Sequence, residues 1–488
     1  MADKAPAGQL APRKKLGLAG VLLPGLAQIA PAFNLLFTTA VVAGLAGASV
    51  PLVYLISMVG FLATALSTAQ FAGIYPSAGG FVTYVARTFG AAVGTVAGFI
   101  MVIGYIIAFA GIYLYVGNYI VTYVFGYAEA QPAWLVVITT IVYGALVTIP
   151  VIVGLHFGVR ATIVLYVIEV AVVLVVICAV LFQSGTDAVG LTAEPFTWPK
   201  QGASNIFLAF SVTVVAFGGF EAAAPLAEET DNPRRNVPIA LVLTVLISGT
   251  LYVLGAWAQV AAFGNDGQAM YEDGNSFATA AQEFLHIGAR FMVPFVAAIF
   301  LISVTSSYIA ANTQTARVIF AGARGGIWPR SLAATSPRFK TPWAAAIAFV
   351  APSIAIGVLS MLITDPDTTS GFLPGFGLFG VVMTYAITNV ALFVQFFKFR
   401  KQGIRKNPFL WLVVPVIGVA VLALPMWGNL RPGQGGAFDW MPLWSLGLLA
   451  AGVVYVVVLK LTRPKVLAAA PALLEGDLAE PDQTAPVA

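Results

Sequence analysis

Two glutamates lie inside long apolar stretches of the sequence, where a charged side chain is least expected. Glu221 follows the pair Gly218-Gly219 by two residues in the stretch 204–227, and Glu169 lies in the stretch 159–183. A charge at the centre of a membrane-spanning helix costs at least about 2.5–3.5 kcal/mol, so such residues commonly serve function. A structural acid paired within a helix bundle is the alternative. Glu221 and Glu169 are therefore our candidate proton-coupling groups.

Few other residues are suited to catalysis or metal binding. The single cysteine, Cys178, lies in an apolar stretch, and the histidines His156 and His286 lie far apart in predicted loops. The sequence contains no HExxH, CxxC or GxxxxGK pattern, so neither metal-dependent catalysis nor nucleotide hydrolysis is supported. We expect a protein that is not an enzyme and that has no cofactor and no metal site.

The first apolar stretch, residues 17–47, contains residues that interrupt a helix. A straight helix of this length would be roughly 46 Å long, against about 30 Å of hydrocarbon in a bilayer. Pro24 and Pro31 each remove a hydrogen bond from the helix interior, and polar Gln28 and Asn34 flank the sequence Ala30-Pro31-Ala32. A tilted, proline-kinked helix is the simpler interpretation.

A second interruption, at Gly218-Gly219, changes that interpretation. The two breaks lie in predicted helices one and six, the first members of two five-helix halves, and paired breaks of this kind indicate a binding site near the bilayer midplane. An unwound helix exposes N–H groups that suit a carboxylate and carbonyl groups that suit an ammonium or a metal cation. We expect the substrate site to be lined by Gln28, Ile29, Ala30, Ala32, Phe33, Val215, Phe217, Gly218, Gly219 and Phe220.

The elements that must position these residues are membrane-spanning helices. Of the 488 residues, 59% are hydrophobic and 9% are charged, against about 25% charged in soluble domains. Only helices cross a bilayer singly, and each needs about 20 apolar residues. The sequence predicts an all-α integral membrane protein with twelve transmembrane helices, at residues 17–47, 50–72, 92–125, 133–153, 159–183, 204–227, 237–263, 291–320, 343–363, 371–397, 409–427 and 441–460.

The basic residues predict the orientation of these helices. When the N-terminus and every second loop are assigned to one side, that side holds all 24 Lys and Arg residues except Lys200, Arg290 and Arg431. Basic loops face the cytoplasm. We therefore expect a multi-pass protein of the plasma (inner) membrane, with both termini cytoplasmic. The net charge of +4 does not indicate a nucleic-acid partner.

Three segments resemble signatures of the amino acid–polyamine–organocation (APC) superfamily. Residues 75–84, YPSAGGFVTY, resemble its P-x-x-GG-x-x-x-Y loop. Residues 217–238, FGGFEAAAPLAEETDNPRRNVP, resemble its F-x-G-x-E…E-x-x-NP-x-R-x-x-P signature. Residues 312–329, NTQTARVIFAGARGGIWP, resemble its N-x-x-x-x-R…AR-x-G-x-x-P signature. All three occur in the expected order, and the resemblance covers about residues 15–465.

The resemblance implies the leucine-transporter fold, with a five-plus-five inverted repeat and two further C-terminal helices. Its predicted units are a cytoplasmic segment 1–15, a first repeat 16–183, a second repeat 184–400, helices eleven and twelve in 401–465, and a disordered tail 466–488.

The sequence departs from the superfamily at the helix-one break. A Gly-Ser-Gly run is usual there, whereas this chain has Ala30-Pro31-Ala32, so Pro31 removes one customary donor to a carboxylate. The amides of Ala32 and Phe33 remain as donors. Val215 stands where an aromatic residue is often found, and Glu169 lies where some proton-coupled relatives carry a lysine. These departures leave the identity of the substrate open.

The resemblance also implies a function. We expect a secondary active transporter, or permease, that moves an amino acid by alternating access and is driven by protons. A polyamine or other amine as substrate, amino acid exchange, and sodium coupling stay open as alternatives. Sodium has possible ligands in the hydroxyls of Ser303, Thr305, Ser306 and Ser307. The expected partners are thus a small solute, a proton or sodium ion, and the lipid bilayer.

Overall fold

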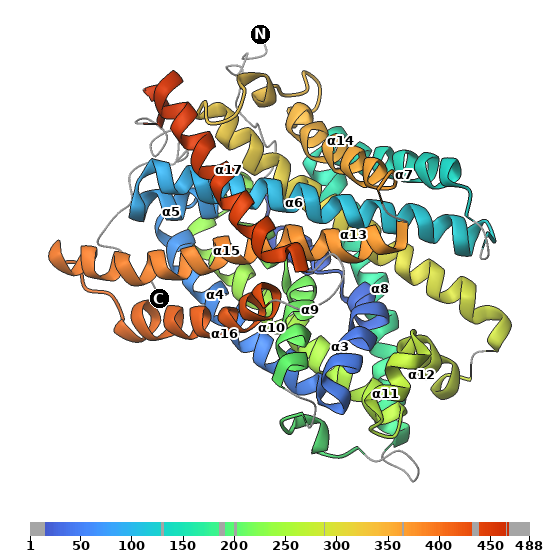
Figure 1. Cartoon of the computed structure of the whole chain (residues 1–488). Helices are drawn as coiled ribbons and strands as arrows, with labels where there is room; N and C mark the ends of the chain where they lie inside the picture. The colour runs from blue at the N-terminus through green and yellow to red at the C-terminus, as the bar shows by residue number, and fades with distance from the viewer. Residues whose placement is uncertain are drawn as a thin grey trace.

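The computed structural model describes residues 15–127, 131–184, 191–199, 203–286, 288–363, 366–431, 439–464 and 466–467. Within these ranges the chain is helical, and its β-structure is confined to one isolated bridge between Leu16 and Thr230. Figure 1 shows the helices packed as one bundle. Most of the predicted segment 1–15 and of the predicted tail 466–488 lies outside the described residues.

Each half of the chain contributes long helices joined by short ones. The first half forms α1 (Leu18–Gln28), α2 (Pro31–Phe33), the π-helical η1 (Asn34–Thr38), α3 (Thr39–Ala46), η2 (Gly47–Ser49), α4 (Val50–Ile74), α5 (Phe81–Phe89), α6 (Ala91–Tyr119), η3 (Ile120–Val124), α7 (Ala133–Val153) and α8 (Leu155–Ser184). The second half forms η4 (Glu194–Phe196), α9 (Ala203–Phe217), the 3₁₀-helical η5 (Phe220–Glu229), α10 (Pro233–Ala262), α11 (Gly267–Asp273), α12 (Ser276–Phe284), α13 (Ala289–Arg324), η6 (Arg330–Ala333), α14 (Trp343–Ser360), α15 (Pro366–Lys401), η7 (Phe409–Val413), α16 (Val414–Leu430) and α17 (Met441–Thr462).

Eleven stretches of the described chain are long and apolar enough to cross a membrane. The first, Leu18–Ile74, has 57 residues and would be roughly 86 Å long as one straight helix. It contains both predicted stretches 17–47 and 50–72, and its backbone turns at Gly47, where φ is 61°. The helical, multi-pass character is therefore confirmed, while twelve crossings and the five-plus-five repeat stay predictions.

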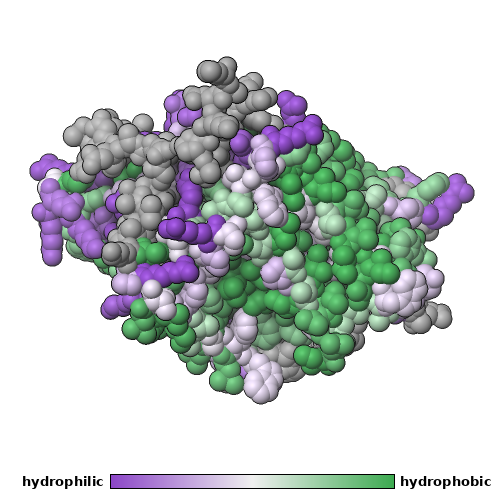
Figure 2. All heavy atoms as spheres, turned by 90° about the horizontal axis from the view of Figure 1, so that it is seen from above, coloured by the Kyte–Doolittle hydropathy of each residue, from purple (hydrophilic) through white to green (hydrophobic). Residues whose placement is uncertain are grey.

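The outer surface of the bundle is apolar where lipid would contact it. Exposed large side chains include Trp134 and Leu146 on α7, Phe182 on α8, and Leu446 and Leu461 on α17. Figure 2 shows hydrophobic side chains over the middle of one face and hydrophilic side chains gathered toward its ends. This distribution suits a protein whose middle is surrounded by hydrocarbon.

The interior of the bundle places the two interrupted helices against each other. The most extensive contacts between helices are those of α6 with α15 and of α4 with α10. The first interrupted helix, α1, packs against α10, α13 and η5. A Cβ added at Gly219 would lie 2.6 Å from the side chain of Gln28. The breaks in the first and sixth predicted helices thus touch.

Two loops show how well the motifs predicted local structure. Gly80 has φ of 48° immediately before α5, a conformation that favours glycine and allows a tight turn at residues 79–80. Asn232, with φ of 45°, precedes Pro233 at the first position of α10. Pro233 is the proline that suits the helix start, and Pro238 lies further inside α10.

Candidate substrate site at two helix breaks

The first break lies between α1 and α2. Ala30 has φ of 50° and ψ of 64°, a left-handed conformation that costs a non-glycine residue roughly 1–2 kcal/mol. Pro31 follows at the first position of α2, where its lack of an N–H group leaves no donor unsatisfied. The sequence predicted this break, and the left-handed residue inside it needs support from the surrounding side chains.

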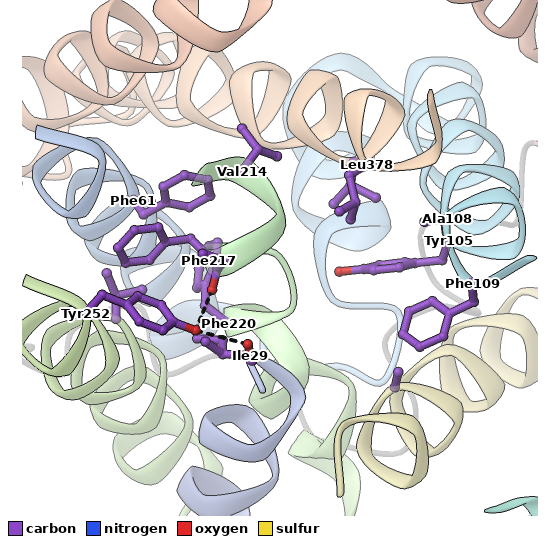
Figure 3. Close-up of a cluster of buried hydrophobic side chains, with 14 of the residues drawn as sticks. Ile29, Phe61, Tyr105, Ala108, Phe109, Val214, Phe217, Phe220, Tyr252 and Leu378 are labelled. Carbon is purple, nitrogen blue, oxygen red and sulfur yellow. Dashed lines mark hydrogen bonds between the residues drawn. The ribbon is translucent and has the colours of Figure 1, made fainter. Parts of the chain in front are cut away.

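Asn34 and Tyr252 supply part of that support by binding the carbonyl groups that the break exposes. The Asn34 side-chain amide donates to the Ile29 oxygen at 2.7 Å and to the Ala30 oxygen at 3.1 Å. The Tyr252 hydroxyl lies 3.0 Å from the carbonyl oxygens of both Ile29 and Ala216, as Figure 3 shows. Tyr252 therefore connects the break in α1 to the end of α9.

Two serines of α13 bind the backbone on either side of the same break. The Phe33 N–H donates to Ser303 Oγ at 3.1 Å, and Ser307 Oγ donates to the Gln28 carbonyl at 2.7 Å. We had considered these serines as sodium ligands. In the structure both hydroxyls instead bind the backbone of the interrupted helix and fix its position on α13.

The second break separates α9 from η5. Gly219 has φ of 102°, a conformation available mainly to glycine, and the nearby Gln28 side chain leaves no room for a Cβ. The ten residues of η5 run as a 3₁₀-helix, whereas runs longer than three or four residues are uncommon and often mark a hinge. The sixth predicted helix is thus interrupted where the glycine pair predicted.

Glu221 lies in the first turn of η5, is fully buried, and accepts three hydrogen bonds. The Tyr105 hydroxyl and the Gln314 amide, at 3.0 Å, donate to one carboxylate oxygen. The Tyr385 hydroxyl donates to the other at 2.6 Å. All three donors are neutral and come from different helices, so no fixed positive charge holds this acid in one protonation state.

Glu169 has a different environment on α8. It is also fully buried, but neither of its oxygens has a hydrogen-bond partner among the described residues. The hydroxyls of Ser303 and Ser306 are the polar groups that act on its carboxyl group. A buried ion without donors is strongly disfavoured. Glu169 is therefore suited to carry a proton or to lie beside a cation.

A cavity of about 40 Å³ lies at the first break, roughly three times the smallest volume that holds one water. None of its lining residues is charged. They are Gln28, Ile29, Ala30, Phe33, Asn34, Tyr105, Phe109, Ile112, Val215, Gly218, Val304, Ser307, Tyr308 and Leu378. Figure 3 shows Tyr105 and Phe109 on α6 to one side of this region and Phe217 and Tyr252 to the other.

Six of the predicted substrate residues line this cavity: Gln28, Ile29, Ala30, Phe33, Val215 and Gly218. The other four lie behind it. Phe217 stacks on Phe61 with ring centroids 4.9 Å apart, and Phe220 packs on Tyr385 at 5.1 Å. Gly219 and Phe220 lie at the turn that begins η5, and Ala32 and Phe217 are fully buried. A binding role for any of the ten stays a prediction.

The lining residues that we did not predict come mainly from α6 and α13. Tyr105 and Phe109 are four residues apart on α6, and so are Val304 and Tyr308 on α13. Residues at this spacing share one helix face. The spacing was visible in the sequence, but only the packing of α6 and α13 against the breaks shows which face meets the cavity.

Ion pairs close one end of the bundle around η5. Glu229 pairs with Arg317, with Nε–Oε2 at 2.6 Å, and Glu228 pairs with Arg324 at 2.8 Å. Leu16 adds backbone bonds to Glu229 and Asp231 at 2.9 and 2.8 Å. Arg234 and Arg235, which follow these glutamates closely in the sequence, are exposed at the start of α10. The partners of Glu229 and Glu228 come instead from the C-terminal part of α13.

An aromatic cluster lies beyond the break, on the part of the interrupted helix that follows it. Phe33 and Phe37 pack against Phe300 of α13 with centroids 6.0 and 5.4 Å apart, and Tyr119 of α6 lies 4.0 Å from Phe300. Phe33 belongs to this cluster and also lines the cavity, so the aromatic cluster borders the cavity.

Comparison with known proteins gives the family. Residues 20–427 match the amino acid permease family. The chain belongs to the amino acid permease family. The resemblance to the APC superfamily is thereby confirmed, and the family is one of membrane transporters rather than enzymes.

Several permeases and transporters are similar over most of their length. The low-affinity putrescine importer PlaP of Escherichia coli is 25% identical over 423 residues, which cover 86% of this chain and 89% of that protein. The branched-chain amino acid permease BcaP of Bacillus subtilis is 24% identical over 439 residues, or 86% and 88% of the two chains. The uncharacterized transporter Rv1999c of Mycobacterium tuberculosis is 28% identical over 385 residues, or 78% and 80%.

Proposed function

We propose that this permease is a secondary active transporter of the plasma membrane that imports a small solute bearing a primary amine. It works by alternating access, with both termini cytoplasmic and with protons as the driving ions. The observation that carries the proposal is the position of Glu221: a buried acid held by three neutral donors, two residues after a helix break, and bound to Tyr105 of the cavity wall.

Proton coupling follows from that environment. A carboxylate whose donors are hydroxyls and an amide has no permanent countercharge that would hold it ionised, so it can bind and release a proton. Glu169, which has no hydrogen-bond donor among the described residues, is the second candidate carrier. One charge moving through about 100 mV supplies about 2.3 kcal/mol, enough for about 50-fold accumulation of a solute.

The amine of the solute is the part that the site accommodates best. Backbone carbonyls at the first break and the two acids attract an ammonium. The sequence favours an amino acid, and the similar proteins include both an amino acid permease and a putrescine importer. Amino acid exchange and sodium coupling remain the alternatives to proton-driven import, although two of the four possible sodium ligands, Ser303 and Ser307, already bind the backbone of the break.

Uptake into proteoliposomes tests this function. The purified protein would be supplied with a panel of radiolabelled amino acids and amines, with and without an inward proton gradient. We expect at least one amine-bearing solute to accumulate above equilibrium and a protonophore to abolish its accumulation, while protein-free liposomes take up none. Accumulation that requires sodium, or that depends only on solute preloaded inside, contradicts proton coupling.

A further inference from the structure

We infer that the turn between α15 and η7 is a binding site for the phosphate headgroup of an anionic phospholipid. The site consists of five bases within nine residues, which we call the basic turn: Lys398, Arg400, Lys401, Arg405 and Lys406. The basic turn lies on the side of the membrane that the distribution of basic residues predicts to be cytoplasmic. The lipid bound there is distinct from the transported solute and from the cavity at the helix breaks.

The charge of the basic turn is not balanced by acids of the chain. The sequence has no aspartate or glutamate between Asp367 and Asp439, and none of the five bases forms an ion pair among the described residues. Arg400, Lys401 and Arg405 are exposed. A helix C-terminus also attracts bases, but it carries only about half an elementary charge. Most of the positive charge is therefore left for a partner from outside the chain.

The backbone of the turn gathers these bases in one place. Gly403 has φ of 78°, and the Ile404 N–H donates to the Phe399 carbonyl at 2.9 Å, a pattern that ends a helix and redirects the chain. After this reversal, Lys406 Nζ lies 5.7 Å from the ring centroid of Phe399. The bases that follow the turn are thus brought back to the end of α15, beside the bases that precede it.

Contacts to neighbouring helices hold the turn on both sides. In η7, the buried Trp411 donates its indole N–H to Gln70 Oε1 of α4 at 3.0 Å, and its ring lies 5.5 Å from that of Phe399. On α15, Lys398 Nζ donates to the carbonyl of Thr88 at the end of α5. The exposed bases are therefore presented from an anchored support, which lowers the entropy lost when a ligand binds.

Apolar side chains beside the basic turn indicate that its partner is a lipid rather than a soluble anion. Phe397 on α15 is 44% exposed, and Phe409 at the start of η7 is 58% exposed. Val390, Phe397 and Lys401 follow at intervals of seven and four residues, so they share one face of α15. Figure 1 shows α15 and α16 side by side. A phospholipid matches this surface, with its acyl chains beside the apolar side chains and its phosphate beside the bases.

Phosphate is the anion that the basic turn suits best. The guanidinium groups of Arg400 and Arg405 can each form paired hydrogen bonds to phosphate oxygens, and the lysines add positive charge around them. Clusters of about four to eight bases next to a membrane helix are typical of anionic-lipid binding. The acids of the C-terminal segment 475–482 are also attracted to positive charge, but that attraction does not account for the exposed Phe397 and Phe409.

Native mass spectrometry of the purified full-length protein tests the site, because it counts the lipids that remain bound. The probes are phosphatidylglycerol, which is anionic, and phosphatidylcholine with the same acyl chains, which has no net charge. Glycerol phosphate, which has the phosphate without acyl chains, is the third probe. The dissociation constant of each probe would be measured for the wild type and for two matched variants.

Each matched variant removes three exposed bases from the predicted cytoplasmic side. The test variant carries three substitutions in the basic turn: Arg400→Gln, Lys401→Gln and Arg405→Gln. The control variant carries the same change of charge in and after η6, at three exposed bases: Arg330→Gln, Arg338→Gln and Lys340→Gln. The single variant Lys401→Gln gives a second measure of the site with only one surface change.

We expect the wild type to prefer phosphatidylglycerol over phosphatidylcholine by about a hundredfold, and the test variant to lose that preference. The reason is that each base near an anionic lipid strengthens binding by about fivefold. Lys401→Gln alone should therefore reduce the preference about fivefold, and the control variant should keep it.

Four outcomes overturn the inference, and the proposed transport function stands in each of them. The first is a wild type that shows no preference, and the second is an equal loss in both triple variants, which reflects a general attraction to this side of the protein. The third is binding of glycerol phosphate as tight as that of phosphatidylglycerol. The fourth is a preference that appears only when the acids of segment 475–482 are replaced by amides, which assigns the basic turn to that segment.

Discussion

At the scale of single residues, the two buried acids are set apart by their hydrogen bonds. Glu221 is surrounded by donors from α6, α13 and α15, and Glu169 has none among the described residues. Hydrogen-bond donors favour the ionised form of a carboxylate and burial favours the neutral form, and both act on Glu221. A change in its three donors during transport would therefore change the proton affinity of Glu221.

Glu221→Gln separates proton binding from substrate binding, because glutamine resembles the protonated acid in shape and size. If Glu221 carries the proton, the variant should still bind and exchange substrate but lose accumulation driven by a proton gradient. If it holds the ammonium of the substrate, binding should weaken at every pH. Counterflow and gradient-driven uptake, measured from pH 5 to 8, distinguish the two roles.

The matched control is Glu272→Gln, which makes the same change at an exposed position on α11 and should leave both activities intact. An unaltered pH profile in Glu221→Gln would transfer the proton role to Glu169 or show that the coupling ion is not a proton.

The sequence predicted the two helix breaks of the candidate site but not the walls of its cavity. The breaks depend on residues close together in the chain, whereas the walls depend on packing between distant helices. Proline, paired glycines and an acid within an apolar stretch act on the backbone at their own positions, so Pro31, Gly219 and Glu221 marked both breaks. The walls of the cavity come from α6, α13 and α15. Tyr105 and Tyr308 are ordinary aromatic residues of apolar helices, and their part in the site depends on packing between segments far apart in the chain.

At the scale of elements, each break is held by side chains from other helices. Asn34 and Tyr252 bind the exposed carbonyls, and Ser303 and Ser307 bind the backbone from α13. Ala30 keeps its left-handed conformation because these contacts together outweigh its cost. The break is thus a property of the assembled bundle as much as of the Ala-Pro-Ala sequence.

Substitutions at Ala30 test whether the break lines the binding site. Leu at this position should abolish substrate binding, because its side chain would fill a cavity of about 40 Å³. Gly should preserve binding and raise the free energy of unfolding by about 1 kcal/mol, since glycine adopts the left-handed conformation without strain. Binding would be measured with radiolabelled substrate and stability by thermal unfolding in detergent.

Ala32→Leu serves as the comparison, because Ala32 is fully buried yet does not line the cavity. It should reduce stability through overpacking. Unchanged affinity in Ala30→Leu would place the binding site elsewhere.

Helix boundaries show the limits of prediction at this scale. Apolar length located the long helices well, because hydrocarbon thickness sets that length. The ion pairs at η5 could not be predicted from the sequence, since Arg317 and Arg324 lie far from Glu228 and Glu229 in the chain and are brought near them by the packing of α13. Hydrophobic length also could not show how Leu18–Ile74 is divided between crossings.

At the scale of the whole molecule, the distribution of basic residues fixes the expected orientation. A cysteine at Asp273, on the exposed end of α11, should react with a membrane-impermeant maleimide in intact cells, in a background where Cys178 is replaced by serine. The control is a cysteine at Arg234, exposed near the opposite end of α10, which should react only after permeabilisation. Labelling of the two positions in the reverse order would invert the topology.

The contacts across the first break also set an order of events during synthesis. Phe33 binds Ser303, 270 positions later, and Gln28 binds Ser307, 279 positions later. At about 5–20 residues per second, the ribosome takes tens of seconds to produce the second partner of each bond. Until α13 is made, the segment around Ala30 lacks two of the contacts that hold the break. We therefore expect the break to take its final form only after α13 has been inserted.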